Sequence, residues 1–156
     1  MIARTGQNKM TPPASTPSQI ATARFNENYN CAQSVFAAFA GQLGMDERIL
    51  LKIASPFGGG VARRGNICGA VTGALMVLGL AMGADTPGGK EEAYQLGQDF
   101  LQRFEARHGT ILCRELLEVD IGTEEGLRQA REKGLTTTLC PRFVSDAAEI
   151  VQAMLE

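Results

Sequence analysis

The chain has four cysteines but no Cys-x-x-Cys pair, and this absence excludes several common cysteine-based sites. Cys31, Cys68, Cys113 and Cys140 follow one another at intervals of 37, 45 and 27 residues. Such spacing lacks the short knuckles of common zinc modules, the clustered cysteines of ferredoxins and the Cys-x-x-Cys-His signature of covalently attached haem. Any site that the four cysteines share must therefore be assembled by the fold, from four separate segments.

The sequence also lacks a basic excess, a secretory leader and the patterns typical of strands. The net charge is −2 and no basic run is interleaved with aromatic residues, so nucleic acid is not expected as a partner. The start of the chain shows no leader with a charged segment, an apolar stretch and a cleavage site, so we expect a cytoplasmic protein with reduced thiols. Alternating β-branched runs are missing, which makes a sheet unexpected.

What remains is a helical pattern along most of the chain. A length of 156 residues predicts one domain. Residues 1–17 are polar and proline-rich and are interpreted as a flexible arm, whereas residues 18–156 are predicted to form a single helical four-cysteine domain. Helices are expected over 28–43, 47–54, 66–82, 91–108, 113–117 and 123–133, with Cys140-Pro141 opening the last one. The fold class predicted is an all-α bundle of about six helices.

One segment has no charged residue at all. Gly65 to Ala84 contains 20 uncharged residues and follows Arg63 and Arg64, so length alone would permit a membrane span. Its glycines, an Asn and a Thr lower the apolar density, and a helix that is apolar on all sides is also what the centre of a bundle requires. We therefore expect Gly65–Met82 to be a buried, Gly/Ala-rich central helix, and we expect no membrane partner.

Glycines recur every four residues in this segment, at Gly65, Gly69 and Gly73. On a helix they would form a smooth face, and because each glycine costs roughly 0.5–1 kcal/mol relative to alanine, something is expected to approach closely. One interpretation is close packing of another helix. The other is a seat for a cofactor, with these three glycines and the neighbouring Arg63 and Arg64 as the binding residues.

Each cysteine is predicted to lie in or just before the first turn of a helix. Residues that favour helix starts stand beside them, namely Asn30, Asn66, Thr110 and Pro141. A first turn offers unpaired N–H groups and the positive end of the helix dipole, so lowered thiol pKa values are expected there. A thiolate is both a nucleophile and a metal ligand. The alternative is that all four cysteines are small buried hydrophobic residues.

The cysteine pattern as a whole resembles that of a known family. Cys31 within Asn-Cys-Ala-Gln-Ser-Val, the block Cys-Gly-Ala-Val-Thr-Gly that begins at Cys68, and then Cys113 and Cys140 are similar to the C-GCAxxG-C-C family. The family name writes Gly-Cys-Ala where this chain has Cys-Gly-Ala, and we take both as one Cys-Gly-Ala-x-x-Gly motif. The resemblance covers roughly residues 25 to 155. It implies redox chemistry at the cysteines and names no substrate.

Two functional classes are predicted from these observations. The first is a redox site formed by all four cysteines, either an iron–sulfur cluster or a thiol/disulfide relay without a cofactor, which serves an unidentified electron-transfer partner. The alternative is a non-catalytic module in which the four cysteines hold zinc or the helices bind a partner. A thiol-dependent enzyme ranks behind both, because no general base is visible near any cysteine. The only histidine, His108, is expected at a helix C-terminus, where its charge is favoured.

Two further expectations concern assembly and the leading cysteine. Apolar faces on several helices, together with the glycine and alanine face, favour a homodimer. Cys68 has both arginines and the glycine face beside it in the sequence, so Cys68→Ser is expected to abolish the activity of the site.

Overall fold

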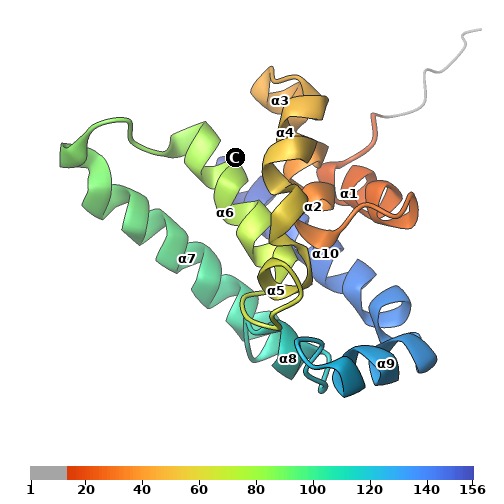
Figure 1. Ribbon diagram of the computed structural model, residues 1–156. Coiled ribbons are helices and arrows are strands. Elements are labelled where there is room, and N and C mark those ends of the chain that lie inside the picture. The colour runs from red at the N-terminus through yellow and green to blue at the C-terminus, as the bar shows by residue number, and fades with distance from the viewer. Residues whose placement is uncertain (1–13) are drawn as a thin grey trace, which may run out of the picture.

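The computed structural model describes residues 14–156, and within this range the fold is all-α, as the sequence predicts. Residues 1–13 of the predicted N-terminal arm lie outside the described residues. In chain order, the elements are α1 (Pro17–Asn26), α2 (Cys31–Ala38), α3 (Ala40–Leu43), α4 (Glu47–Ala54), the 3-10 turn η1 (Ser55–Phe57), α5 (Gly58–Val61), α6 (Gly69–Met82), the 3-10 turn η2 (Pro87–Gly89), α7 (Lys90–His108), α8 (Cys113–Leu116), α9 (Glu124–Glu132) and α10 (Leu135–Leu155). Figure 1 shows their arrangement.

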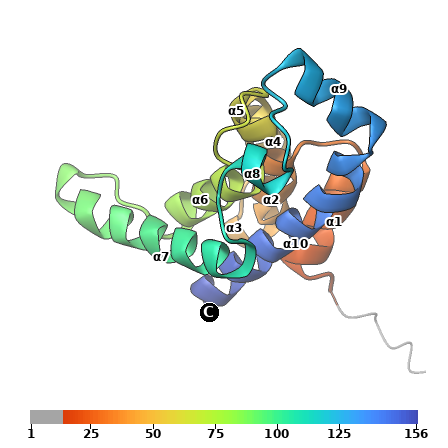
Figure 2. The same cartoon turned by 90° about the horizontal axis from the view of Figure 1, so that it is seen from below.

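Helix α6 is the centre of the bundle. It packs against α2, α10 and α7 (Figures 1 and 2). Its first turns are buried at Ala70, Val71, Ala74 and Val77, whereas its last turn from Gly79 onward is exposed. The uncharged segment is thus a core helix over most of its length. No helix among the described residues is long and apolar enough to cross a membrane.

The glycine face of α6 lies against α2. A Cβ atom at Gly73 would lie 2.7 Å from the carbonyl oxygen of Ala32, and one at Gly69 would lie 3.0 Å from the Cβ of Cys31. The two backbones therefore approach more closely than any larger residue permits. Close helix packing, the first of the two interpretations of these glycines, accounts for Gly73 completely.

Three predicted helix boundaries differ from the structure. The helix expected over 66–82 begins only at Gly69, because the preceding residues are extended and Ile67 forms an antiparallel bridge with Leu112. The helix expected over 28–43 breaks at Phe39, where the backbone turns and the side chain is fully buried. The last helix begins at Leu135 instead of Cys140.

The start of α10 explains that last difference. Gly134 has φ +61°, which lets the chain reverse direction after α9, and the amide of Thr138 already bonds to the carbonyl of Gly134 at 3.1 Å. Pro141 therefore lies inside the helix, where its missing N–H leaves the carbonyl of Thr137 without its helical donor. Cys140 is thus a mid-helix residue and not a helix start.

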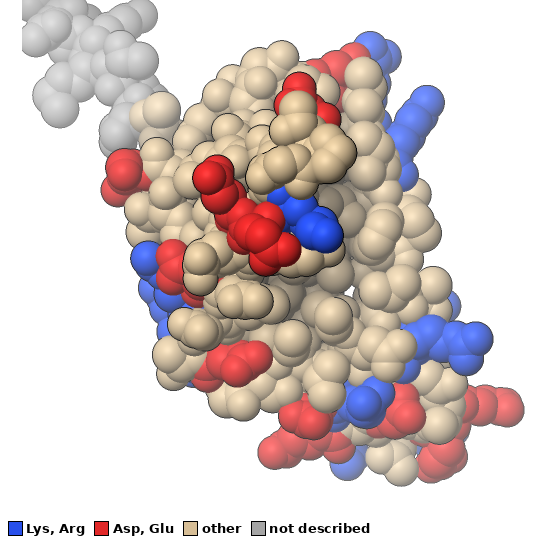
Figure 3. Space-filling view, turned by 90° about the vertical axis from the view of Figure 1, so that its left-hand side faces the viewer, with Lys and Arg blue, Asp and Glu red and all other residues tan. Residues whose placement is uncertain are grey.

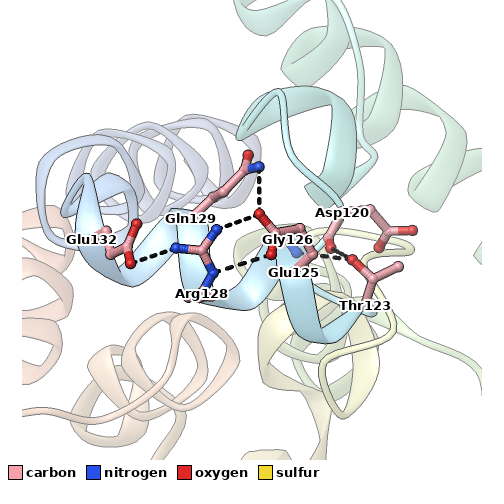
Figure 4. Close-up of polar contacts among 7 residues, drawn as sticks. All are labelled: Asp120, Thr123, Glu125, Gly126, Arg128, Gln129 and Glu132. Carbon is pink, nitrogen blue, oxygen red and sulfur yellow. Dashed lines mark hydrogen bonds and ion pairs between the residues drawn. The ribbon is translucent and has the colours of Figure 1, made fainter.

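Helix α9 is held at its start and on its outer face by polar contacts (Figure 4). The hydroxyl of Thr123 accepts a hydrogen bond from the amide of Gly126 at 3.0 Å, which caps the helix. Arg128 bonds both Glu125 and Glu132, as the acidic and basic residues of an exposed helical face commonly do. These contacts stabilise α9 itself, which lies at the bottom of the molecule as Figure 1 views it.

Helix α7 is the least covered of the long helices. Only Phe100 and Phe104 are buried within its 19 residues, and its N-terminal half projects away from the bundle (Figure 2). A shallow groove of about 340 Å³ separates this half from α6 and is lined by apolar residues such as Leu75 and Tyr94. On the face shown in Figure 3, acidic and basic side chains are interspersed in small groups.

Candidate functional site

All four cysteines line one cavity of about 790 Å³. Cys68, Cys113 and Cys140 are buried, Cys31 is partly exposed, and all four are free thiols. They come from the first residue of α2, the residue before α6, the first residue of α8 and the middle of α10. Segments far apart in the sequence therefore meet at one place.

Cys31 is positioned by the cap of α2. The side chain of Asn30 accepts a hydrogen bond from the amide of Gln33 at 2.9 Å, and the Gln33 side chain in turn accepts one from the amide of Asn30. The amide group of Asn30 also donates to the carbonyl of Ser55 at 2.9 Å. Cys31 is thereby fixed relative to both α6 beneath it and the chain after α4.

Cys68 and Cys113 are brought together by the short antiparallel bridge. The amide of Cys68 donates to the carbonyl of Ile111 at 2.8 Å, and the amide of Cys113 donates to the carbonyl of Asn66 at 2.6 Å. Side chains alternate between the two faces of extended segments, so the two cysteines lie on the same face, opposite to Ile67 and Leu112. Both then enter the first turn of a helix, as predicted.

The pKa values of the thiols do not follow the prediction from helix starts. Burial raises the pKa of Cys68 to about 12, although the backbone N–H groups of Ala70 and Val71 act to lower it. Burial also raises the pKa of Cys113 to about 12. Desolvation of the charged form therefore outweighs the favourable helix terminus, and the expectation of lowered pKa values is wrong for these two cysteines.

Cys31 and Cys140 form a coupled pair. A hydrogen bond from the thiol of Cys31 lowers the pKa of Cys140, even though burial acts in the opposite direction. The same hydrogen bond, followed by burial and the charges of the other three cysteines, raises the pKa of Cys31 well above its usual range. The thiol with the lowered pKa is therefore Cys140, which lies inside α10. The sequence analysis predicted this lowering from a helix start, but its cause is the neighbouring thiol of Cys31.

The wall opposite the thiols is a left-handed turn. Five consecutive residues, from Gly59 to Arg63, have positive φ angles between 51° and 66°. Left-handed backbone costs roughly 1–2 kcal/mol for a residue with a Cβ atom, and Val61, Ala62 and Arg63 all have one. A Cβ atom at Gly60 would lie 2.8 Å from the Cβ of Cys113, so this turn packs directly on the thiol site.

The residues predicted to bind a cofactor divide into two groups. Gly69 and Arg63 line the cavity, together with Gly58, Gly59 and Gly60 of the left-handed turn. Arg63 and Arg64 are both exposed, but Arg64 does not line the cavity, and neither Gly65 nor Gly73 does. A Cβ atom at Gly65, where φ is +69°, would lie 2.8 Å from a carboxylate oxygen of Asp120. Gly65 therefore allows the tight turn that precedes the bridge between Ile67 and Leu112.

Sequence reasoning missed several residues of the cavity wall. These include Tyr29, Thr136, Thr137 and Phe143, which lack any motif of their own. Because Thr136 and Thr137 belong to α10, a correct start for that helix would have placed them beside Cys140, whereas Phe143 already lies in the predicted last helix.

His108 lies just behind this wall. It ends α7 as predicted, and its ring contacts the ring of Phe143 edge-on at 5.1 Å between centroids. Its Nε2 atom lies 2.9 Å from a carboxylate oxygen of Asp146, and burial lowers its pKa in spite of that carboxylate. The histidine is a packed residue behind Phe143 and does not line the cavity.

The spacing of the thiols bears on metal binding. Among residues 14–156, no three cysteine, histidine, aspartate or glutamate side chains are gathered closely enough to hold a metal ion. The four cysteines come from four separate elements and line one cavity.

Residues 29–154 match the sequence model of a family described as "Putative redox-active protein (C_GCAxxG_C_C)". The matched range contains all four cysteines, the left-handed turn and the helices that surround the cavity. No curated protein and no solved structure matches the chain.

Proposed function

Because the chain belongs to the C_GCAxxG_C_C family of redox-active proteins, we propose that it is a thiol/disulfide redox protein in which Cys31 and Cys140 form the exchanging pair. The observation that carries this proposal is that Cys31 and Cys140, from α2 and α10, line the same cavity as direct neighbours. Each of these two thiols is the largest single influence on the pKa of the other, which is lowered at Cys140 and raised at Cys31. A thiolate beside a neutral thiol is what a two-step thiol exchange requires.

The chemistry follows from these two roles. The Cys140 thiolate attacks one sulfur of an incoming disulfide, the sulfur–sulfur bond breaks, and the leaving thiolate takes a proton. Cys31 then loses its proton and attacks the sulfur of Cys140, which releases the second thiol. Two electrons pass from the protein to the substrate, and an intramolecular disulfide between Cys31 and Cys140 remains.

Cys68 and Cys113 are proposed as a second pair that renews the first. Their charges act on Cys31, and that of Cys113 acts on Cys68, so all four sulfurs lie within electrostatic reach. Exchange of the two buried thiols with the disulfide would restore Cys31 and Cys140 and leave a second disulfide. The high pKa values of Cys68 and Cys113 make this step slow at neutral pH.

The test is a redox titration of the full chain with peptide mapping. Protein equilibrated in dithiothreitol buffers of increasing oxidation is alkylated and analysed by mass spectrometry. A disulfide between Cys31 and Cys140 should form first, and Cys31→Ser and Cys140→Ser should each abolish it. Cys68→Ser and Cys113→Ser should leave it intact.

Two results would contradict the proposal. One is four thiols that remain free throughout the titration, which would leave them as buried core residues. The other is protein purified without oxygen that contains stoichiometric iron or zinc bound through the cysteines. In that second case the site would be a metal centre, and the thiol exchange proposed for it would be wrong.

A further inference from the structure

We infer that the substrate of this site is a small disulfide that carries negative charge, and that Arg63 binds this charge. The inference rests on the proposed thiol/disulfide function and specifies its substrate class. It is based on the contents of the cavity wall, the placement of Arg63 and the difference between Arg63 and its neighbour Arg64.

The cavity has room for a small molecule in addition to the four thiols. Its volume of about 790 Å³ lies within the range of roughly 300–1,000 Å³ that is typical of ligand pockets. The wall is composed of thiols, glycines, apolar side chains and uncharged polar groups such as Asn30 and Thr137. Among residues 14–156, Arg63 is the only charged residue that lines it.

The side chain of Arg63 is held by the left-handed turn. A Cβ atom at Gly59 would lie 2.9 Å from the Cγ of Arg63, so the glycine leaves the space in which the arginine folds back over the turn. Arg63 itself has φ +63°, a conformation that costs free energy at a residue with a Cβ atom. The fold therefore holds this cation at the cavity in a strained backbone conformation.

The charge of Arg63 is not neutralised by the rest of the molecule. No carboxylate among residues 14–156 forms an ion pair with Arg63. The acidic residue that acts on a cysteine is Asp120, which raises the pKa of Cys113 only as a minor cause. The carboxylate of Asp120 accepts a hydrogen bond from the amide of Gly122 at 2.8 Å, and Asp120 does not line the cavity.

The starts of two helices add to this positive field. Cys31 is the first residue of α2 and Cys68 directly precedes α6, so the N-termini of both helices face the cavity. Each contributes partial positive charge from the N-terminal end of its helix dipole. An anionic substrate is favoured by this environment before any covalent step, and a cationic one is disfavoured.

The reaction is the exchange already described, with the charge of the substrate engaged by Arg63. A disulfide with a carboxylate on each arm places one carboxylate at the guanidinium while its sulfur meets the Cys140 thiolate. The sulfur–sulfur bond breaks, one proton from Cys31 and one from solvent end on the two product thiols, and the disulfide of Cys31 and Cys140 forms. The oxidant is the substrate itself.

Three disulfides of similar length and different charge test the inference. Reduced full-length protein is mixed at low ionic strength with dithiodipropionate, which is anionic, with hydroxyethyl disulfide, which is neutral, or with cystamine, which is cationic. The rate of protein oxidation is divided by the rate at which dithiothreitol reduces the same compound, which removes differences in intrinsic reactivity. We expect the anionic compound to react about tenfold faster than the cationic one, and added salt to reduce the difference.

Variants at the two neighbouring arginines supply the control. Arg63→Gln should abolish the preference, Arg63→Lys should retain most of it, and Arg64→Gln should behave as the unaltered protein because Arg64 lies outside the cavity. Equal normalised rates for all three compounds, or loss of the preference in Arg64→Gln alone, would overturn the inference and leave the thiol exchange standing. If no disulfide oxidises the protein, the proposed function fails as well.

Discussion

The two cysteine pairs of this cavity differ in what surrounds each sulfur. Cys31 and Cys140 share a hydrogen bond, and one member has a lowered pKa. Cys68 and Cys113 lie on the same face of a backbone bridge, and burial raises both pKa values to about 12. The comparison teaches that a neighbouring thiol lowers a thiol pKa in this cavity more effectively than a helix start does. At Cys68, burial raises the pKa by more than the backbone N–H groups of the helix terminus lower it.

The largest expected effect concerns the reactivity of Cys140. At pH 8 a thiol with a pKa of about 12 is ionised in roughly one molecule in ten thousand, whereas the pKa of Cys140 is lowered, so Cys140 should react with iodoacetamide at least about tenfold faster than Cys113 even though a thiolate of higher pKa is the stronger nucleophile. Cys140→Ser should abolish the fast phase in time-resolved mass spectrometry, and Cys113→Ser should leave it. A fast phase that survives in Cys140→Ser would remove the distinction between the pairs.

The second effect is a loss of stability at high pH. A raised thiol pKa means that folding favours the protonated form, so this contribution is complete below pH 9 and is lost as the pH rises towards 12. Each of Cys68 and Cys113 should contribute a slope of up to about 1.4 kcal/mol per pH unit in this window. Urea unfolding between about pH 8 and pH 10.5, which is from roughly half a unit below to roughly two units above the usual thiol pKa, measures it.

Alanine variants separate the two pairs in that experiment. Cys68→Ala and Cys113→Ala should each make the alkaline loss of stability shallower, because each removes one group with a raised pKa. Cys140→Ala should leave the contribution of both groups in place. An alkaline slope that is unchanged in Cys68→Ala would show that burial does not set the pKa of this thiol.

The smallest expected effect concerns how α2 is held beside α6. Alanine at Gly73 would meet the backbone of Ala32 at 2.7 Å, and such overpacking typically costs about 1–3 kcal/mol. By moving α2, Gly73→Ala should also slow alkylation of Cys140. Gly79→Ala is the matched control in the same helix, since nothing lies within 4 Å of the added atom, and it should stabilise by about 0.5–1 kcal/mol. Thermal unfolding of both variants distinguishes these outcomes, and equal melting temperatures would contradict close packing at Gly73.

Local signals in the sequence predicted some elements well. The helix expected over 47–54 has the bounds of α4, because Asp46 caps it with a hydrogen bond to the amide of Arg48 at 2.9 Å. The end of α7 was equally predictable, since Gly109 adopts the left-handed conformation with φ +81° that commonly terminates helices. In both cases the determinant lies within a few residues of the boundary.

Other features depend on partners far away in the chain. The start of α6 is delayed because the preceding residues pair with the segment around Leu112, and no local pattern announces that bridge. Pro141 resembles a helix start in isolation, yet it is accommodated inside α10. The left-handed turn likewise joins glycines, which favour it, to Val61, Ala62 and Arg63, which do not.

The sequence by itself determined the helical fold and the family, and it identified the four cysteines as the candidate site, because periodicity, caps and motifs are local properties. Only the tertiary structure decided which thiol has the lowered pKa and which arginine lines the cavity. Cys31 lowers the pKa of Cys140 across most of the length of the chain, and burial raises those of Cys68 and Cys113. Desolvation and hydrogen bonding depend on distances between elements, and such distances are set only when the helices pack.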